Sequence, residues 1–444
     1  MTMRCRFTFL LAFLASASTV AFADDAPREF VPQLLGAQYT FVDQHQYALR
    51  SPYAGPLSLL PQGDTERSHT FGAYFGVPLP EHLQFYFDLE MFKGEGVSGA
   101  TGLGGLTNGD VIRSGSGQLG KRAYVARRFL RWTLPLGDET QAVERAQDQL
   151  PGTEAARRFD IKLGKMAVSD DFDKNRYANS TRTQFMNWSL WDDTAWDFAA
   201  DTRGYTNGVV IAYVSPHWNL RYGVYQMPTM ANGQTLEWPL SRARGEQAQL
   251  TVRDKPDGWA LRLLVYRNIA RMGVYRDALA IAEANGTAPD IRADDRDGRR
   301  KYGYAVNAEL PLADDGDTGL FARAGWNDGK IESFVFTEVD RDLSVGAQIS
   351  GAHWRRPRDR LGIAVDINGL SRDHRDYLAA GGSGFVLGDG ALDYGREEIA
   401  EIYYALQPIA HVTLGPDFQF IRDPGYNNDR GPARFIGIRA HLEY

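Results

Sequence analysis

The stretch RFIGIRAHLEY, residues 434–444, alternates apolar side chains with glycine or polar ones from Ile436 to its end. The apolar row is Ile436, Ile438, Ala440, Leu442 and Tyr444, and the polar row is Gly437, Arg439, His441 and Glu443. Successive side chains of a strand point to opposite faces, so the stretch predicts a strand with one apolar and one charged face. In a soluble sheet the apolar face would meet a core, and in a membrane barrel it would meet lipid. This stretch alone leaves both open.

The same period of two recurs along the chain and predicts about sixteen strands from Ala37 onward. In HLQFYFDLEMF, residues 82–92, one row is Leu83, Phe85, Phe87, Leu89 and Met91. Other copies are RFDIKLGK (158–165), HWNLRYGVYQ (217–226), EQAQLTVR (246–253), GWALRLLVYRN (258–268), YGYAVNAEL (302–310), GLFARAGWN (319–327), LSVGAQIS (343–350), RLGIAVDIN (360–368), EEIAEIYYAL (397–406) and HVTLGPDFQF (411–420).

The connections between these stretches alternate between short and long. Short turns are predicted at 78–81, 215–216, 254–257, 313–318, 355–360 and 407–408, and long polar loops near 43–69, 93–121, 167–203, 227–244, 271–300 and 369–395. Short periplasmic turns at one end and long extracellular loops at the other are typical of an antiparallel up-and-down barrel in an outer membrane. A Greek-key sandwich would mix the two kinds. The predicted fold is therefore an all-β transmembrane barrel.

The charged rows assign the faces of the predicted strands. They carry Arg127, Arg131, Lys162, Arg221, Arg253, Arg262, Arg323, Asp366 and Glu401. Packing these groups into a soluble core would bury many unpaired charges at several kcal/mol each. We therefore expect the charged rows to face a wet lumen and the apolar rows to contact outer-membrane lipid. A sixteen-stranded barrel is too wide for side chains to fill, which predicts an aqueous channel.

The N-terminus reads as a secretory signal peptide. A basic start, the apolar run 7–14 and the A-x-A motif at Ala21–Ala23 predict residues 1–23 as the signal and 24–444 as the barrel domain. Cys5 is the only cysteine and would leave with the signal, so no disulfide is expected. The formal charge of −7 then becomes −9, because Arg4 and Arg6 leave too. Such an acidic balance argues against nucleic acid as a partner.

The insert DETQAVERAQDQLPGTEAAR, residues 138–157, interrupts the pattern. It lies between two predicted strands at the end where the turns are otherwise short. We interpret it as a brief helix or a mobile insert, without a function.

Several motifs are incomplete. GSGQLG, residues 115–120, lacks the strand, the helix and the Ser or Thr of a phosphate-binding loop and is interpreted as a surface loop. Asp171, Asp173 and Asn175 match the first three ligands of a calcium loop, but Arg176 and Arg182 replace its Gly and Glu. A looser cation site stays open. The chain has neither H-E-x-x-H nor G-x-S-x-G, so no metal, cofactor or catalytic residue is predicted.

The loop 168–204 carries many large rings among charged residues: Phe172, Tyr177, Phe185, Trp188, Trp191, Trp196 and Phe198. Loops that only face solvent seldom carry so many rings, so we expect this one to fold into the lumen. The rings can anchor the loop to the barrel wall. They can also form a constriction where ring faces meet the C–H faces of a sugar, while Asp, Asn and Arg bind its hydroxyls. The two interpretations are compatible.

At these residues the chain resembles the carbohydrate-selective outer-membrane porins of the OprB type. The similar stretches are DDFDKNRYANSTRTQFMNWSLW (170–191), AWDFAADTRGYTNG (195–208), RNIARMGVYRDALA (267–280), HRDYLAAGGSGFVLGDG (374–390) and IRDPGYNNDRGP (421–432). The resemblance implies a monomeric sixteen-stranded barrel for passive uptake of glucose-like sugars. It makes Asp171, Phe172, Asp173, Asn175, Trp188, Trp191 and Arg203 candidates for the narrow zone, beside the lumen-wall candidates Arg127, Arg131, Arg221, Arg253, Arg262, Arg323, Asp366 and Glu401.

The preferred function is therefore a sugar channel in the outer membrane of a Gram-negative bacterium, with small sugars as permeating solutes. A general porin, a barrel enzyme of the lipase or protease type, and a plugged structural or adhesin barrel are the alternatives. An enzyme would need one of the scattered histidines His69, His217, His353, His374 and His411. We further expect the barrel-assembly machinery to recognise the last strand, which ends at Tyr444, and the protein to be a monomer or a trimer.

Overall fold

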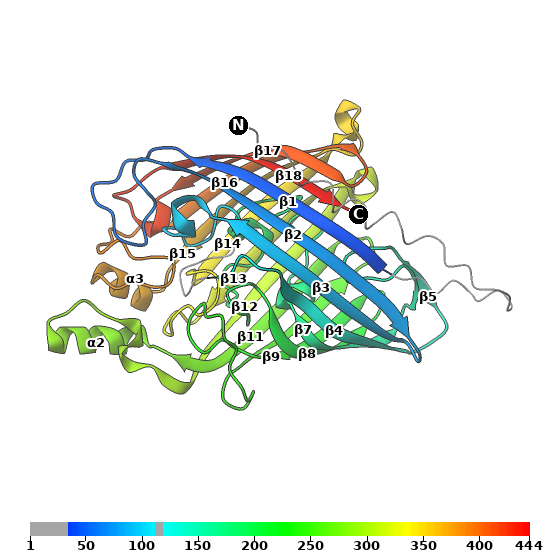
Figure 1. Cartoon of the computed structure of the whole chain (residues 1–444), viewed down its shortest axis with the longest axis horizontal. Helices are drawn as coiled ribbons and strands as arrows, with labels where there is room; N and C mark the ends of the chain where they lie inside the picture. Colours follow the sequence, from blue (N-terminus) through cyan, green and yellow to red (C-terminus); the bar gives the residue numbers. More distant parts are fainter. Residues whose placement is uncertain (1–33, 112–118) are drawn as a thin grey trace, which may run out of the picture. The chain divides into compact units, whose positions relative to one another are not determined.

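Sixteen strands form a closed antiparallel barrel in the computed structural model, which describes residues 34–111 and 119–444 (Figure 1). The predicted signal peptide and most of GSGQLG lie outside the described residues. The strands of the barrel are β1 (Leu34–Gln46), β2 (Asp64–Leu79), β3 (Leu83–Gly94), β4 (Tyr124–Pro135), β7 (Arg158–Met166), β8 (Thr206–Val214), β9 (Trp218–Tyr225), β10 (Arg244–Arg253), β11 (Ala260–Met272), β12 (Arg296–Ala313), β13 (Thr318–Asn327), β14 (Arg341–Ser350), β15 (Arg360–Gly369), β16 (Glu397–Ile409), β17 (Val412–Arg422) and β18 (Ala433–Glu443).

Each strand of the barrel pairs with its neighbours in chain order, and β1 pairs with β18 to close the ring. The strands β5 and β6 form a separate two-stranded sheet. Phe41 lies opposite Ala440 in the pair of β1 and β18, and Tyr444 donates to and accepts from the backbone of Ala37 at 2.9 and 3.0 Å. Closure removes the free edges of the sheet, so each strand can pair on both sides. The predicted barrel is confirmed.

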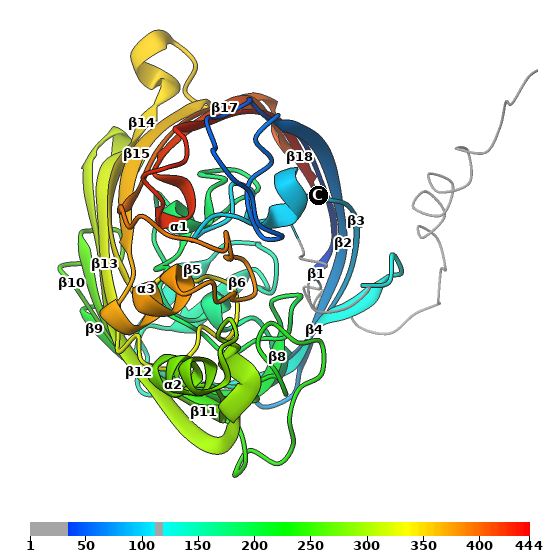
Figure 2. The same ribbon diagram turned by 90° about the vertical axis from the view of Figure 1, so that its left-hand side faces the viewer.

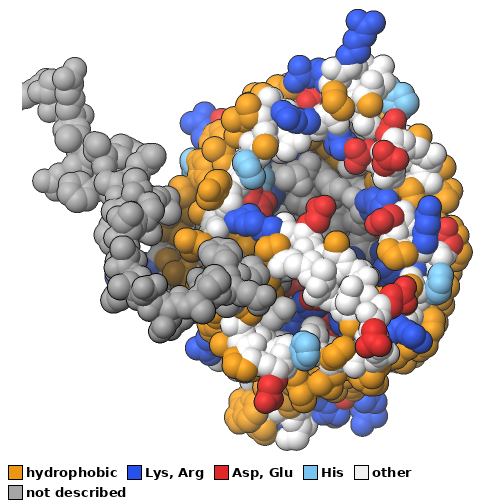
Figure 3. Space-filling model, turned by 90° about the vertical axis from the view of Figure 1, so that its right-hand side faces the viewer, with side chains coloured by type: hydrophobic (Ala, Val, Ile, Leu, Met, Phe, Trp, Pro, Cys, Tyr) orange, Lys and Arg blue, Asp and Glu red, His pale blue; other side chains and the backbone are white. Residues whose placement is uncertain are grey.

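The two faces of the strands have the predicted character. On β18, Ile438 is 62% exposed on the outside, whereas Arg439 is 3% exposed on the inside. In the same way, Val345 of β14 is exposed on the outside, whereas Asp366 of β15 is buried on the inside. Figure 3 views the end where the chain makes its short turns and shows hydrophobic side chains around the outside of the barrel and charged ones in its opening. The apolar rows are therefore placed to contact lipid.

Short connections lie at one end of the barrel, the turn end, and long ones at the other, the loop end. The turns are 80–82, 215–217, 254–259, 314–317, 351–359 and 410–411, and the loops are 47–63, 95–123, 167–205, 226–243, 273–295, 328–340, 370–396 and 423–432. The loops carry α1 (Trp188–Trp191), α2 (Tyr275–Asn285), α3 (Arg372–Ala379) and the 3-10 turns Val97–Ala100, Val168–Asp170, Ile291–Asp294 and Pro424–Tyr426. None of the described helices is long and apolar enough to cross a membrane.

The lumen is narrower than the sequence indicated. Loops from the loop end fold inward and bury a core of their own, which includes Trp188, Trp196, Phe198 and Phe336. Several charged wall residues that we expected to be wet are covered by these loops, among them Arg323, Asp366 and Glu401 at 2% exposure or less. Burial is possible for Arg323 and Glu401 because loop backbone groups satisfy their hydrogen bonds.

The insert 138–157 contains no helix, so the first of its two interpretations is wrong, and nothing in the structure tests whether the insert is mobile. It forms a two-stranded hairpin, β5 (Thr140–Val143) and β6 (Gly152–Ala155), within the ring of strands (Figure 2). Pro151 and Gly152 interrupt any helical run, and Gly152 adopts a φ of 148°. Contacts with the lumen wall then favour the hairpin over the helical propensity of residues 141–149.

The outer face generates the first testable prediction. Val345 lies at the middle of β14, and Leu312 lies near the turn end of β12. Arginine on the lipid face costs about 2–4 kcal/mol at the bilayer midplane and about 0–1 kcal/mol near its surface. Val345→Arg should therefore lower the free energy of unfolding in lipid vesicles far more than the control Leu312→Arg, as measured by denaturant titration. Equal losses would contradict the placement of the outer face in hydrocarbon.

Candidate functional site

The loop 167–205 enters the barrel and is fixed to its wall by buried ion pairs and hydrogen bonds. Arg323 of β13 donates to Asp173 Oδ2 at 2.8 Å and to the carbonyl oxygen of Ala178 at 2.7 Å. On the opposite side of the loop, Glu401 of β16 accepts from the backbone N–H groups of Met186 and Asn187 at 2.6 and 2.9 Å. Charge-assisted bonds of this kind are strong when water is excluded. The loop is therefore part of the barrel interior.

Two glycines on the inner row of β13 allow this close approach. A Cβ atom at Gly319 would overlap the Tyr177 ring, and one at Gly325 would overlap the carboxylates of Asp193 and Asp342. Glycine is the residue that lets another chain segment lie directly on a strand. Both positions lie on the same inner row as Arg323, so a single strand makes room for the loop and also binds it.

The rings of the loop divide into two sets. Phe172 packs on Trp196, and Phe185 packs edge-on against Tyr403 of β16 with ring centres 4.9 Å apart. These rings are buried, and the contact between Phe185 and Tyr403 anchors the loop to the wall. Trp188, Trp191 and Phe198 line a cavity, where Trp188 stacks on Phe336 with ring centres 5.0 Å apart. The rings therefore anchor the loop in part, and a contact between the cavity rings and a sugar stays a prediction.

This cavity has a volume of about 560 Å³ and lies in the lumen between the loops and the hairpin. Its apolar side is the ring surface of Trp188, Trp191, Phe198 and Phe336, and its polar side carries charges of both signs. The charged lining residues are Glu90, Asp110, Arg127, Asp148, Asp170, Lys174, Arg182, Arg203 and Glu443. Cations and anions are nearly balanced, so the space suits a neutral polar molecule with one apolar face.

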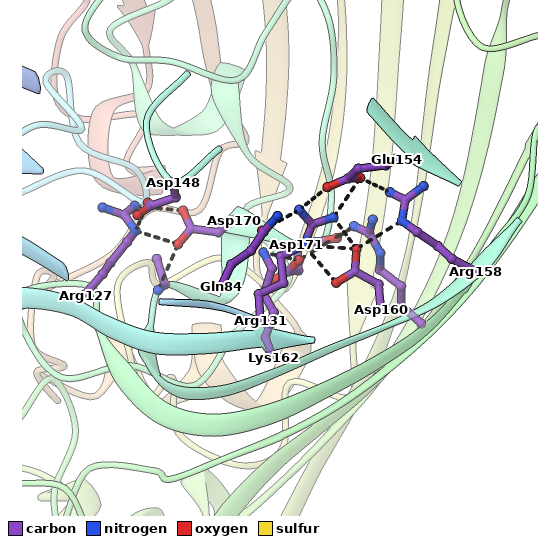
Figure 4. Close-up of polar contacts among 12 residues, drawn as sticks. Gln84, Arg127, Arg131, Asp148, Glu154, Arg158, Asp160, Lys162, Asp170 and Asp171 are labelled. Atoms are coloured by element: carbon purple, nitrogen blue, oxygen red, sulfur yellow. Dashed lines mark hydrogen bonds and ion pairs between the residues drawn. The ribbon is translucent and has the colours of Figure 1, made fainter. Parts of the chain in front are cut away.

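Arg127 of β4 connects the parts that narrow the lumen. It holds Asp170 of the loop through two hydrogen bonds of 2.7 Å. It also lies 3.2 Å from Asp148 of the hairpin (Figure 4). Asp88 of the wall lies 3.3 Å away from Arg127. Burial alone would raise the pKa of Asp170, but the Arg127 guanidinium overrides it and lowers this pKa to about 2. Asp170 therefore stays ionised at all physiological pH values, and this contact persists.

A second charged group borders the cavity. Arg182 donates to Asp110 at 2.8 Å and to Glu90 at 3.1 Å. Glu90 also accepts from the hydroxyls of Tyr124 and Tyr205 at 3.1 and 2.5 Å. Arg203 stacks over the ring of Tyr124 at 4.3 Å. These contacts hold guanidinium and carboxylate groups in place at the edge of the open space.

Four of the fifteen candidates from the sequence line this cavity: Arg127, Trp188, Trp191 and Arg203. Asp171, Asp173 and Asn175 of the loop, and Arg323 and Glu401 of the wall, make the contacts that hold the loop on the wall. Phe172 packs inside the loop on Trp196. Three further arginines do not line the cavity and bind other groups. Arg131 pairs with Asp160 and Glu154. Arg221 donates to the carbonyl oxygen of Asp171, and Arg262 pairs with Glu309. Arg253 and Asp366 do not line the cavity either. A direct part in a constriction stays a prediction for these residues.

Sequence reasoning missed other lining residues. Glu90 lies on a charged row of a predicted strand, and Arg182 lies in the aromatic loop. Nothing in the sequence distinguishes either residue from its neighbours. Gln147 and Asp148 belong to the insert, to which we had assigned no function. Only the way the segments fold into the lumen brings these four together.

Asp171, Asp173 and Asn175 each bind a different partner, namely Lys162, Arg323 and Asn307. Among the described residues, no group of three or more His, Cys, Asp or Glu is arranged to hold a metal ion.

His374 of α3 lies fully buried, with its Nδ1 atom 3.1 Å from Asp340 Oδ2, and stacks on Tyr275. This pair fastens α3 to its neighbouring loops.

The anchor of the loop can be tested by Arg323→Met. Removing one partner of a buried pair costs about 3–5 kcal/mol, because Asp173 is left as a buried charge. The loop should detach and become open to trypsin at Lys174, Arg176 and Arg182, while the barrel stays folded. The measurement is limited proteolysis of the folded protein, with Arg296→Met, which changes a mostly exposed arginine, as the control. Continued protection of the loop would contradict this role of Arg323.

Comparisons with known proteins agree with this architecture. The solved structure of Pseudomonas putida OprB at high pH superimposes with a TM-score of 0.70 and 16% identity, over 93% of this chain and 94% of that chain. The outer membrane channel DcaP of Acinetobacter baumannii gives a TM-score of 0.51 and 11% identity, over 93% and 97%. At these identities the likeness is one of fold. No curated protein sequence matches the chain. The model of the OprB family, carbohydrate-selective porins, matches residues 79–444, and the chain therefore belongs to this family.

Proposed function

We propose that this porin is a passive channel for neutral monosaccharides of the glucose type, without a cofactor and without catalysis. The observation that carries the proposal is the cavity in which the stacked rings of Trp188 and Phe336 lie beside fixed guanidinium and carboxylate groups. A pyranose offers an apolar C–H face and a rim of hydroxyls, which suit the two sides of this space.

The charges of the cavity support selectivity for neutral solutes. Arg127 and Arg182 each bind carboxylates from different segments, so neither sign dominates the opening. A solute with hydroxyls can exchange hydrogen bonds with these groups without leaving a charge unpaired. Conduction also requires that each contact be weak enough to release the solute. Several partial contacts along the cavity meet this need better than one tight site.

The distribution of loops and turns supports one orientation of the barrel in the membrane. In an outer membrane the loop end faces the exterior and the turn end faces the periplasm. A sugar would enter between the loops, slide along the rings and pass the Arg127 group before it leaves. Signal-peptide removal, recognition of the strand ending at Tyr444 by the assembly machinery, and a monomeric or trimeric state stay predictions of the sequence.

Liposome swelling tests the proposal. Liposomes that contain the refolded protein should swell in glucose faster than protein-free liposomes, and Trp191→Leu should weaken glucose binding. The lost ring contact amounts to about 1 kcal/mol, a factor of about five in affinity. Affinity is measured from the block of ion current by glucose. Trp238→Leu is the control, because Trp238 is 69% exposed and lies outside the cavity.

Protein that stays folded but admits no monosaccharide would refute the proposal. An equal effect of both tryptophan variants would contradict the stacking role of Trp191 while leaving a channel in place. An unselective porin would pass disaccharides as fast as glucose.

Charge selectivity provides another prediction. Arg127→Gln removes the cation shared by Asp88, Asp148 and Asp170, so the lumen gains net negative charge. The permeability ratio of K⁺ to Cl⁻ should rise by about threefold or more. It is measured from the reversal potential in a KCl gradient. Arg267→Gln, at an exposed pair with Glu246 outside the cavity, should leave the ratio unchanged. An unchanged ratio in Arg127→Gln would contradict a position on the permeation path.

A further inference from the structure

The β5–β6 hairpin is held at its base by a network of ion pairs. Arg131 of β4 contacts Glu154 of β6 and Asp160 of β7, each at 2.5 Å. Arg158 contacts the same Glu154 at 2.9 Å (Figure 4). All four side chains are about nine-tenths buried. These ion pairs fix the orientation of the hairpin, which extends from the turn end into the lumen.

Further along, the hairpin lies on the inner face of neighbouring strands. The Leu150 N–H donates to the Tyr86 hydroxyl of β3 at 3.2 Å, and Leu150 is buried. Arg145 donates to the Leu35 carbonyl oxygen of β1 at 2.8 Å, and its guanidinium lies 5.9 Å from the Tyr74 ring centre. The hairpin follows β4 in the sequence, and the three strands that it contacts, β1, β2 and β3, therefore all precede it. The hairpin thus covers a strip of wall and takes up lumen space.

The tip of the hairpin reaches the cavity described above. Gln147 donates to Asp88 at 2.7 Å and accepts from Gln38 at 3.1 Å. Asp148 lies 3.2 Å from Arg127, and its Oδ1 atom is buried without a hydrogen-bond partner among the described residues. Ala146, Gln147 and Asp148 all line the cavity. The tip therefore places the carboxyl group of Asp148 and the amide of Gln147 at the cavity, where Arg127 also meets the inward loop.

From this geometry we infer that the hairpin is a specificity-determining wall of the channel, in which Gln147 and Asp148 contact the hydroxyls of the passing sugar and the hairpin limits its size. The inference rests on the proposed function and extends it. Loop 167–205 narrows the lumen from the loop end and the hairpin narrows it from the turn end, and both meet at Arg127. A solute must pass between them.

Removal of the hairpin tests the size limit. The Ala156 N–H donates to the Glu139 carbonyl oxygen at 2.8 Å, so these residues already lie side by side. Residues 140–155 can be replaced by Asn-Gly, a two-residue turn that suits antiparallel strands. We expect the single-channel conductance to rise about twofold or more, and a trisaccharide to swell liposomes at a rate close to that of glucose. An unchanged conductance and an unchanged size limit would overturn the inference.

A second variant keeps the hairpin and probes its tip. In a Cys5→Ser background, Gln147→Cys should react with a negatively charged methanethiosulfonate reagent and lose about half or more of its conductance, because the adduct enters the path. The matched control is Thr140→Cys, at an exposed position of β5 outside the cavity. Conductance that is insensitive to the reagent at both positions would overturn the role of the tip, even if the shortened protein fails to fold.

The unaltered protein separates the two proposals. If it stays folded but admits no monosaccharide, the proposed function and this inference both fail. If it admits glucose while the hairpin variants behave as it does, the inference fails and the sugar channel stands.

Discussion

Backbone pairing between β1 and β18 is the constraint on which the rest of the structure depends. In hydrocarbon, an unpaired N–H or C=O group costs several kcal/mol, so a sheet is stable there only when it closes on itself. Closure by sixteen strands fixes two environments at once. The outer row must be apolar because it has no water, and the inner row can be charged because protein and water lie on that side.

The inner charges then do more than line an open pore. Arg323 and Glu401 draw a loop from the loop end into the barrel, and Arg131 holds a hairpin from the turn end. Each of these groups binds a partner far away in sequence, so burial does not leave it unsatisfied. What stays open is a small space around Arg127. Its limits are set by segments that are not part of the barrel sheet.

The barrel could be predicted from the sequence because contact with lipid requires apolar residues at every second position of each strand, and this pattern is visible within the strand itself. The alternation of apolar and polar residues predicts the strands, the charged rows predict which face meets water, and the short and long connections predict the topology. The site was predicted only in part. The aromatic loop was correctly expected in the lumen, but Asp173 and Asn175 anchor it behind the cavity, while Arg182 and Glu90 border the open space. Period and composition do not encode which side of a folded loop faces a cavity.

The insert shows the same limit. Its residues 141–149 favour a helix by propensity, whereas contacts with the wall, such as those of Glu154, Gln147 and Leu150, stabilise a hairpin. Such contacts join residues far apart in the chain and leave no periodic signal. The account is tested most directly by an electron cryo-microscopy map of the protein in lipid nanodiscs with glucose. We predict lipid against the outer row of Val345 and Ile438 and sugar density between Trp191 and Arg127. A dry, filled space at that position would contradict the account.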